Sequence, residues 1–428
     1  MLNHKRLLMV VLGVVVVAAF QLFYTYDDTR IISNHPYILS KYFAVNRSDP
    51  WKECKNTRNS NDTRYGKQRN TYDKVFNLTR DEANAAAKER GSEPSIILGY
   101  FRGINKNNPP EYPWKWLASQ GRTNKCSSNC VYTLDYRMIS CADLVVVHHE
   151  YGGLNVQHLE WLRQQNKQVP WAWMEHESPH NTGGQSKLRH LFQFTATYSR
   201  SSHLWISNFF VVPKEKPDTS GTAVDHANEK TKTVIIFMSN CVGFRIQFIR
   251  KLQKYINVDF FGGCNRKAEK RSCPRYSKLC EKKQKQYRFY LALENSFCED
   301  YHTEKFYWQG LQKGLVPITF FDYNSLKKKP IVAPPKSFIN ILDYPNMKAL
   351  AAHLNYLNNN NTAYNDYHAW RNNFSVFSKN RCTICEEAQR INVKEKKGLP
   401  TIRIDEYWNK TSQCTGYVDK MFQKYLVN

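Results

Sequence analysis

The chain has 428 residues, of which 41% are apolar, which is enough for two globular domains plus extensions and excludes a disordered chain. It carries 62 Lys and Arg residues against 37 Asp and Glu residues, a formal net charge of +25 at neutral pH. This excess of positive charge favours an anionic partner, which would be nucleic acid, lipid headgroups or a phosphorylated small molecule.

An apolar run over residues 7–24 follows the basic residues Lys5 and Arg6. The run is long enough for a short membrane span, and it lacks the small-residue cleavage site of a signal peptide. Because the basic residues favour the cytoplasmic side, everything after the span should be lumenal. We therefore expect a single-pass type II protein with a cytoplasmic tail (1–6), a transmembrane signal-anchor (7–24) and a polar stem (25–92).

Two further features favour a lumenal body. The chain contains twelve cysteines, several of them closely paired, which suits an oxidising compartment; their unequal spacings and the lack of a nearby His pair disfavour zinc. Six sequons without Pro at the middle position are candidate glycosylation sites, namely Asn46, Asn61, Asn77, Asn360, Asn373 and Asn409. In this compartment nucleic acid is no longer expected as a partner.

From about residue 95 the chain alternates short β-rich runs with helical patterns, which predicts an α/β fold with parallel sheets. The predicted strands cover residues 95–100, 143–148, 168–174, 233–238, 258–261, 287–293 and 316–321. Helices are expected over 245–255 and 304–313, the second ended by Gly314. The polar, turn-rich stretch 216–232 predicts a linker between two domains.

Residues 287–321 carry the most informative pattern, a strand, a polar loop, a helix and a second strand. Ligands of such sheets bind at the carboxyl ends of strands, where helix N-termini also gather. Thr303 can cap the helix and leave Glu304 and Lys305 in its first turn, so that Lys305 faces a diphosphate and Glu304 accepts from sugar or ribose hydroxyls. Taken alone, the same pair also fits an ordinary solvated helix start.

The loop and helix of this segment spell ENSxCxDYxTEK, with Glu294, Asn295, Ser296, Cys298, Asp300, Tyr301, Thr303, Glu304 and Lys305 at the fixed positions. This pattern resembles the donor-binding signature of the inverting α1,3-fucosyltransferases, glycosyltransferase family ten. Other motifs in the family's order extend the resemblance over residues 95–420. They are WAWMEHESPHN (171–181), TATYSRSS (195–202), MSNC (238–241) with Arg245, and CTIC (382–385).

The resemblance implies a GT-B type α/β fold with two Rossmann-like domains facing a cleft. The acceptor-side domain would cover 93–215, the GDP-fucose-binding domain 233–380, and a segment over 381–428 would return to the first domain. The implied donor-binding residues are Ser239, Asn240, Arg245, Glu294, Asn295, Tyr301, Thr303, Glu304 and Lys305. The family pattern also implies disulfides that join Cys382 and Cys385 to Cys126 and Cys130.

Inverting transfer needs a carboxylate that takes the proton of the attacking hydroxyl. By resemblance this base is Glu177, in the Glu-Ser-Pro turn after the aromatic strand. Glu175, two residues away, is a rival, and the end of another strand offers a third acceptor-side group formed by His148, His149 and Glu150.

The resemblance, together with the expected membrane anchor, implies a Golgi membrane enzyme that transfers L-fucose from GDP-fucose, with inversion, to a GlcNAc hydroxyl of a glycoprotein glycan. Cys264, Cys273 and Cys280 resemble the invertebrate and plant branch that modifies the N-glycan core, and antennal acceptors stay open. We expect no required metal or other cofactor, because no Asp-x-Asp cluster stands at a strand end; stimulation by a divalent metal is left open. The alternatives are an inactive lumenal glycan-binding protein of the same fold and a transferase for another nucleotide sugar.

Overall fold

A computed structural model of the chain describes the parts that form two sheets and their connections, all within the compact unit Arg58–Asn428. The described residues are 95–101, 130–133, 139, 142–149, 154–207, 209–218, 224–265, 273, 277–322, 326–327, 331–378, 384–386, 388, 400–409, 413–414 and 425. Within these residues no helix is both long enough and apolar enough to cross a membrane. The predicted signal-anchor, 7–24, lies outside them.

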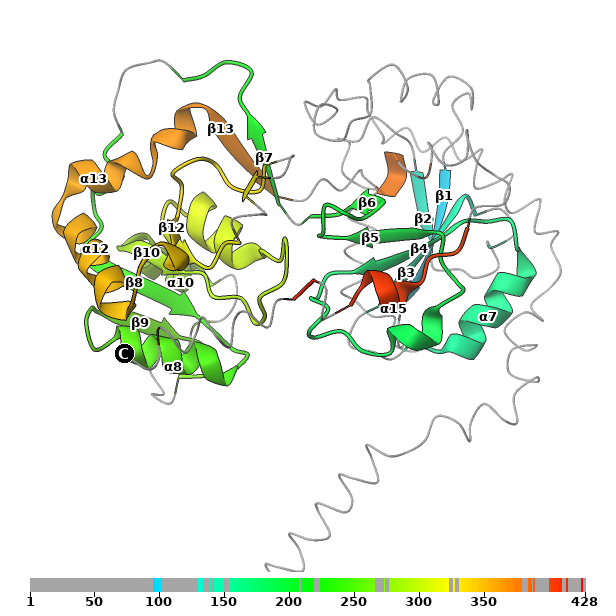
Figure 1. Cartoon of the computed structure of the whole chain (residues 1–428). Helices are drawn as coiled ribbons and strands as arrows, with labels where there is room; N and C mark the ends of the chain where they lie inside the picture. Colours follow the sequence, from blue (N-terminus) through cyan, green and yellow to red (C-terminus); the bar gives the residue numbers. More distant parts are fainter. Residues whose placement is uncertain are drawn as a thin grey trace, which may run out of the picture. The chain divides into compact units, whose positions relative to one another are not determined.

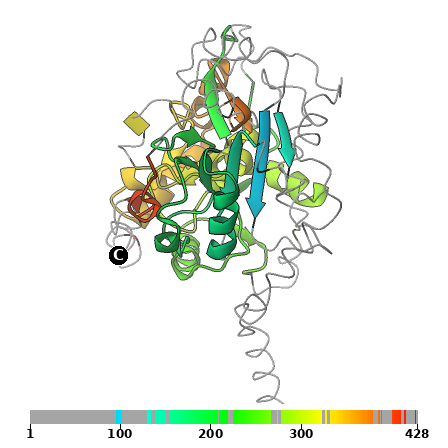
Figure 2. The same cartoon turned by 90° about the vertical axis from the view of Figure 1, so that its right-hand side faces the viewer.

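Six parallel strands form the first sheet in the order β2-β1-β3-β4-β5-β6. Their bounds are β1 (Ser95–Phe101), β2 (Cys130–Thr133), β3 (Leu144–His148), β4 (Trp171–Glu175), β5 (Phe194–Thr197) and β6 (Leu204–Trp205). Figure 2 shows β1, the blue arrow, beside β2 with both strands pointing the same way. Alternate side chains of β3 enter two cores: Val145 packs with Leu159 of helix α7 (Val156–Gln165), and Leu144 packs on the opposite face with Ile384.

Five parallel strands form the second sheet in the order β12-β11-β10-β8-β9. Their bounds are β8 (Lys232–Phe237), β9 (Val258–Phe261), β10 (Tyr287–Leu291), β11 (Val316–Thr319) and β12 (Ile339–Asn340). The helices around them are α8 (Gly243–Leu252), α10 (Lys278–Lys285), the π-helix η4 (Lys305–Gln312), α12 (Met347–Asn359) and α13 (Asn361–Asp366), most of which are labelled in Figure 1.

Neighbouring residues of β8 again point to opposite faces of the sheet. Ile236 packs in a core with Phe248 of α8 and Leu354 of α12. Ile235 packs on the other face with Phe306 and Leu311 of η4. Helices therefore cover both faces of this sheet, which explains why its strands read as almost continuous apolar runs.

A separate two-stranded antiparallel ladder joins segments on either side of the second sheet in the sequence. Strand β7 (Phe209–Pro213) pairs with β13 (Phe374–Ser378), with Val211 opposite Val376. The remaining short elements are η3 (Gln185–Leu188), η5 (Ile341–Asp343), η6 (Ala369–Asn372) and α15 (Ile404–Tyr407). The C-terminal part divides between the two cores: Trp408 packs with Trp173 of the first sheet, and Tyr425 packs with Phe248 beside the second.

The seven predicted strands all occur, with ends within three residues of the expected ones. The two predicted helices also occur, as Gly243–Leu252 and Lys305–Gln312, but the second is a π-helix rather than an α-helix. Gly310 in this helix packs so closely on Pro317 that a β-carbon would lie 2.5 Å from the proline ring. The sequence prediction did not contain the β7–β13 ladder.

Candidate active site

The second sheet has a switch point between β8 and β10. The chain passes from β8 outward to β9 and then returns to the other side of β8 for β10. Ligands of open parallel sheets bind at the carboxyl ends of the strands beside such a point. A pocket of about 610 Å³ opens there. Six of the predicted donor-binding residues line it, namely Ser239, Asn240, Arg245, Asn295, Glu304 and Lys305.

Arg245 connects the segments that follow the two strands at the switch point. It lies in the first turn of α8, is 2% exposed, and donates to the carbonyl oxygens of Leu293 (3.2 Å) and Asn240 (2.5 Å). Its buried Nε has no hydrogen-bond partner in the described part of the chain. Burial lowers the pKa of Arg245, and the charge of Glu294 partly offsets this effect. The guanidinium is thus a fixed buried cation in the pocket wall.

Lys305 lies in the same wall but is already paired. Its Nζ lies 3.0 Å from Glu294 Oε2, 2.8 Å from Thr303 Oγ1 and 3.4 Å from Glu304 Oε1. Burial alone would lower the pKa of Lys305, but the two carboxylates outweigh it and raise the pKa, so the ammonium stays charged. Glu294 and Thr303 are buried behind the pocket surface and hold Lys305, whereas the sequence analysis placed them among the donor contacts. The Thr303 hydroxyl lies 3.5 Å from the Lys305 amide, where a helix cap is expected.

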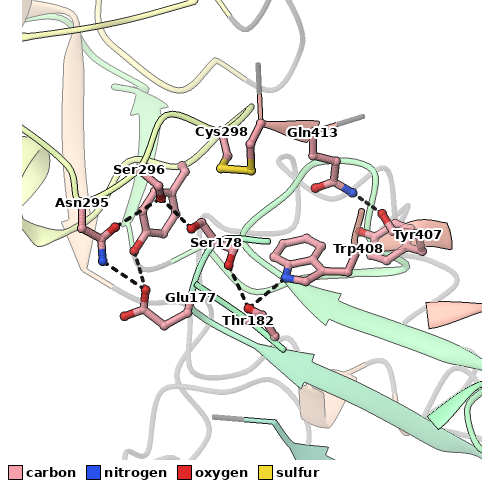
Figure 3. Close-up of a disulfide and its surroundings, with 11 residues drawn as sticks. Glu177, Ser178, Thr182, Asn295, Ser296, Cys298, Tyr407, Trp408 and Gln413 are labelled. Atoms are coloured by element: carbon pink, nitrogen blue, oxygen red, sulfur yellow. Dashed lines mark hydrogen bonds between the residues drawn. A yellow bond between two sulfur atoms is a disulfide. The ribbon is translucent and has the colours of Figure 1, made fainter. Parts of the chain in front are cut away.

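Glu177 lies in the turn that follows β4 and lines the same pocket. Its Oε2 accepts hydrogen bonds from Asn295 Nδ2 at 3.3 Å and from the Tyr301 hydroxyl at 3.0 Å. Figure 3 shows the side chains of Glu177 and Asn295 pointing toward each other from different elements. The candidate base of the first sheet is therefore held by the loop that follows β10 of the second. Tyr301, expected to bind donor, is 5% exposed and is not among the lining residues.

Four further contacts fasten this loop, residues 295–301. Ser296 Oγ donates to Ser178 Oγ at 2.5 Å, beside Glu177 in Figure 3. A disulfide joins Cys298 to Cys414, and the amide of Glu299 donates to the carbonyl of Gln413 at 2.8 Å. The last contact is a buried ion pair in which the carboxylate of Asp300 accepts from the amide and the guanidinium of Arg200.

The sequence analysis gave Arg200 no role, although it lies in the TATYSRSS motif. Two opposite charges could have indicated this contact. Arg200 is the only charged residue of TATYSRSS, and Asp300 lies at a fixed position of ENSxCxDYxTEK. Asp300 also adopts a positive φ of 61°, which Asp tolerates better than most residues because its short side chain bonds locally. The ion pair holds together two motifs whose paired residues, Arg200 and Asp300, are 100 positions apart in the chain.

The rival groups lie deeper than Glu177. Glu175, at the end of β4, is fully buried, and His148 and His149 at the end of β3 are 7% and 1% exposed. None of the three lines the pocket. Nδ1 of His149 lies 3.5 Å from Oε2 of Glu175, but burial lowers the pKa of His149 to about 4, so the imidazole is neutral at neutral pH. Glu150 lies outside the described residues.

The buried histidines predict a loss of stability in acid. Burial lowers the pKa of His302, stacked on Phe321, to about 3, and that of His149 to about 4, against about 6.5 when unfolded. As the pH falls from about 6.5 toward 4, the unfolded chain binds protons that the folded chain does not, so each histidine lowers stability by up to about 1.4 kcal/mol per pH unit. Thermal midpoints measured between pH 7.5 and 4 should therefore fall.

The matched pair of variants is His302→Gln, which removes a buried imidazole, and His190→Gln, which changes an exposed one. The first should flatten the pH dependence of the midpoint and the second should leave it unchanged. Equal slopes for the wild type and His302→Gln would show that His302 is not a buried neutral group.

Among the described cysteines, complete disulfides join Cys241 to Cys264, Cys273 to Cys280 and Cys298 to Cys414. Cys385 is also disulfide-bonded. Cys126, Cys382 and the side chain of Cys130 lie outside the described residues. The predicted link between the late pair and the early pair therefore stays a prediction.

The other predicted sites fall partly within the described chain. Asn373 is exposed, and Asn360 and Asn409 are partly exposed, while Asn46, Asn61 and Asn77 lie outside the described residues. Across the described ranges, no three His, Cys, Asp or Glu side chains are grouped as a metal site. Glycan occupancy and independence from metal stay predictions.

Comparison with known proteins places the chain in a family. Residues 93–208 match the family model described as "Fucosyltransferase, N-terminal", and residues 227–403 match "Glycosyltransferase family 10 (fucosyltransferase) C-term". Alpha-(1,3)-fucosyltransferase 7 of Bos taurus is 31% identical over 300 residues, which cover 68% of this chain and 81% of that protein. The chain belongs to glycosyltransferase family 10, the fucosyltransferases. This confirms the family resemblance of the sequence motifs.

Another family 10 relative is alpha-(1,3)-fucosyltransferase fut-1 of Caenorhabditis elegans, 29% identical over 71% of this chain and 70% of that protein. A solved structure of an alpha1,3-fucosyltransferase with GDP-fucose aligns at 12% identity and a TM-score of 0.44, over 72% of this chain and 94% of that one. In the present chain, the match to the N-terminal family model contains Glu177, and the match to the C-terminal model contains Arg245 and Lys305.

Proposed function

We propose that this family 10 chain transfers L-fucose from GDP-fucose to a hydroxyl group of GlcNAc in a glycoprotein glycan, with inversion at the anomeric carbon. One observation carries the proposal: the residues that line one pocket at the switch point include the carboxylate of Glu177 and the cations of Arg245 and Lys305. A nucleotide sugar needs both, because its diphosphate is anionic and its transfer requires a base.

The donor half of the proposal rests on charge and position. Arg245 is held at the ends of β8 and β10, and Lys305 opens the helix that follows β10. Helix α8 also begins at this edge, and its N-cap residue makes no side-chain capping bond in the described chain. These groups would bind the diphosphate and neutralise the charge that develops on GDP as it departs. Ser239, Asn240 and Glu304 complete the wall and are suited to ribose and phosphate oxygens.

Glu177 would act as the general base. Its carboxylate takes the proton of the acceptor hydroxyl while that oxygen forms a bond to C1 of fucose. The bond between C1 and the β-phosphate oxygen breaks on the opposite side, so GDP leaves and the configuration inverts. The hydrogen bonds from Asn295 and Tyr301 hold the carboxylate where donor and acceptor meet.

The proposed domain roles, acceptor and membrane anchor rest on the sequence analysis. The two parallel sheets would form two Rossmann-like domains of GT-B type, the first binding the acceptor and the second the donor. The acceptor would be the N-glycan core or an antenna, with the core favoured by Cys264, Cys273 and Cys280. The apolar run 7–24 with Lys5 and Arg6 before it would anchor the enzyme in the Golgi membrane as a type II protein.

Release of GDP from GDP-fucose tests the proposal. The purified full-length protein should release GDP from GDP-fucose in the presence of a GlcNAc-terminated core or antennal glycan, and GDP-mannose or UDP-sugars should not support transfer. Mass spectrometry of the glycan should show one added deoxyhexose. Binding of glycan without GDP release from any donor would favour the inactive glycan-binding alternative.

A further inference from the structure

Glu175 is a buried acid that the proposed reaction does not use, although it lies two residues from the proposed base. It occupies the last position of β4 and has no exposed surface. Its rigid setting at the end of the strand contrasts with that of Glu177, which is partly exposed in the turn beyond. A fully buried carboxyl group is costly unless its oxygens are hydrogen-bonded, so its contacts show what it holds.

The Oε1 atom of Glu175 accepts two backbone hydrogen bonds from the turn that carries the base. One comes from the amide of His176 at 2.9 Å and the other from the amide of Glu177 itself, also at 2.9 Å. These two peptide units set the direction in which the Glu177 side chain leaves the backbone. The Glu175 carboxylate thus accepts from the first two amides of the turn, as a side-chain oxygen does when it caps a helix.

His149 lies beside Glu175 and against β4. Its Nδ1 lies 3.5 Å from Glu175 Oε2, and its ring contacts the ring of Trp173 in β4, with the two centroids 5.7 Å apart. The amide of His149 donates to Met174 at 2.8 Å, which fixes this residue against β4. His149 therefore packs beside Glu175, and Glu175 holds the start of the turn that carries Glu177.

From this arrangement we infer that Glu175 is a positioning residue for the transfer reaction: it holds the backbone of the turn so that the Glu177 carboxylate points into the donor pocket. The inference rests on the proposed role of Glu177 as base. Glu175 does not itself line the pocket, so a substrate hydroxyl in the pocket would meet Glu177 first. Loss of Glu175 would leave two partly buried amides without this acceptor and free the turn to rotate away from Asn295 and Tyr301.

A double-mutant cycle tests whether Glu175 acts through Glu177. The variants are Glu175→Ala, Glu177→Gln and the double variant, each measured for turnover per folded molecule, GDP affinity and thermal midpoint. Glu175→Ala should lower kcat by about ten- to a hundredfold in the wild-type background and leave GDP affinity unchanged. In the Glu177→Gln background the same substitution should lower the residual kcat by less than about twofold, because there is no base left to position.

Two further variants separate positioning from catalysis and from packing. Glu175→Gln keeps an oxygen for both amides and should retain most of the turnover. The matched control is Gln193→Ala, because buried Gln193 Oε1 accepts from the amide of Trp171 at 2.9 Å, at the other end of β4. It removes a similar bond far from the pocket, so the thermal midpoint should fall while kcat per folded molecule stays the same.

Each outcome bears on the inference. An equal loss of kcat in both backgrounds, or a loss matched by Gln193→Ala, would overturn it, because Glu175 would then act on folding or on donor binding. Loss of all turnover in Glu175→Gln would overturn it in favour of direct catalysis by Glu175. If Glu177→Gln alone kept full turnover, the proposed base, and not only this inference, would be wrong.

Discussion

Glu177→Gln is expected to lower turnover by about a hundredfold or more, the scale of a lost general base, while GDP affinity and the thermal midpoint change little. Gln preserves the size of the side chain and still accepts hydrogen bonds from Asn295 and Tyr301 at the carbonyl oxygen. It does not accept the proton of the acceptor hydroxyl. The measurement is kcat from GDP release, together with calorimetric titration of GDP and a thermal melt of the same preparation.

The control for this prediction is Glu150→Gln, which changes the carboxylate that follows the histidine pair of β3. It should keep most of the turnover. The assignment of the base would fail if Glu150→Gln abolished transfer while Glu177→Gln stayed active. A lower thermal midpoint for Glu177→Gln with unchanged turnover per folded molecule would instead give Glu177 a structural role.

Arg245→Ala and Lys305→Ala are expected to weaken GDP binding by about ten- to a hundredfold each, because each removes a charge-assisted contact to phosphate. Arg245→Ala should also lower the thermal midpoint, since the side chain holds the carbonyls of Asn240 and Leu293. Lys305→Ala leaves Glu294 buried without its cation, so the midpoint should fall here too. Calorimetric titration at a temperature well below both midpoints separates affinity from stability.

Arg250→Ala is the matched control for charge, because Arg250 lies exposed on the same helix, α8. It lowers the net charge by the same amount and should leave GDP affinity within about twofold, since exposed charges are screened by salt. Unchanged GDP affinity in folded Arg245→Ala and Lys305→Ala would mean that the donor site lies elsewhere. Equal weakening by all three variants would indicate a general effect of charge.

Most strands of the two sheets could be predicted because buried parallel strands give a local pattern, a short run of apolar residues between turns, although β2 and β5 were not predicted. Residues 258–261 show how well this works, since the predicted strand and β9 have the same ends. Pairing between distant segments gives no such pattern. The β7–β13 ladder joins residues more than 160 positions apart in the chain, and β6 and β12 have two residues each, too few for a period to be recognised.

In the candidate site too, features with a local sequence pattern could be predicted and contacts between distant segments could not. Arg245 and Lys305 were predicted for the ends of strands, and the structure places both in one pocket wall. The family resemblance favoured Glu177 over Glu175, but the spacing of the residues did not separate them, because two residues of one extended segment share a face. Their difference comes from depth, since the strand ends at Glu175 and the turn then carries Glu177 outward to the pocket. The position of Tyr301 against Glu177 depends on packing between two sheets and has no signal in either motif alone.

The position of the bound donor tests the central claim most directly. A crystal structure of Glu177→Gln with GDP-fucose should show the diphosphate at the ends of β8 and β10, within hydrogen-bond distance of Arg245 and Lys305. C1 of fucose should face the side chain at position 177. A diphosphate bound instead at the ends of β1 and β3, the switch point of the first sheet, would contradict the account.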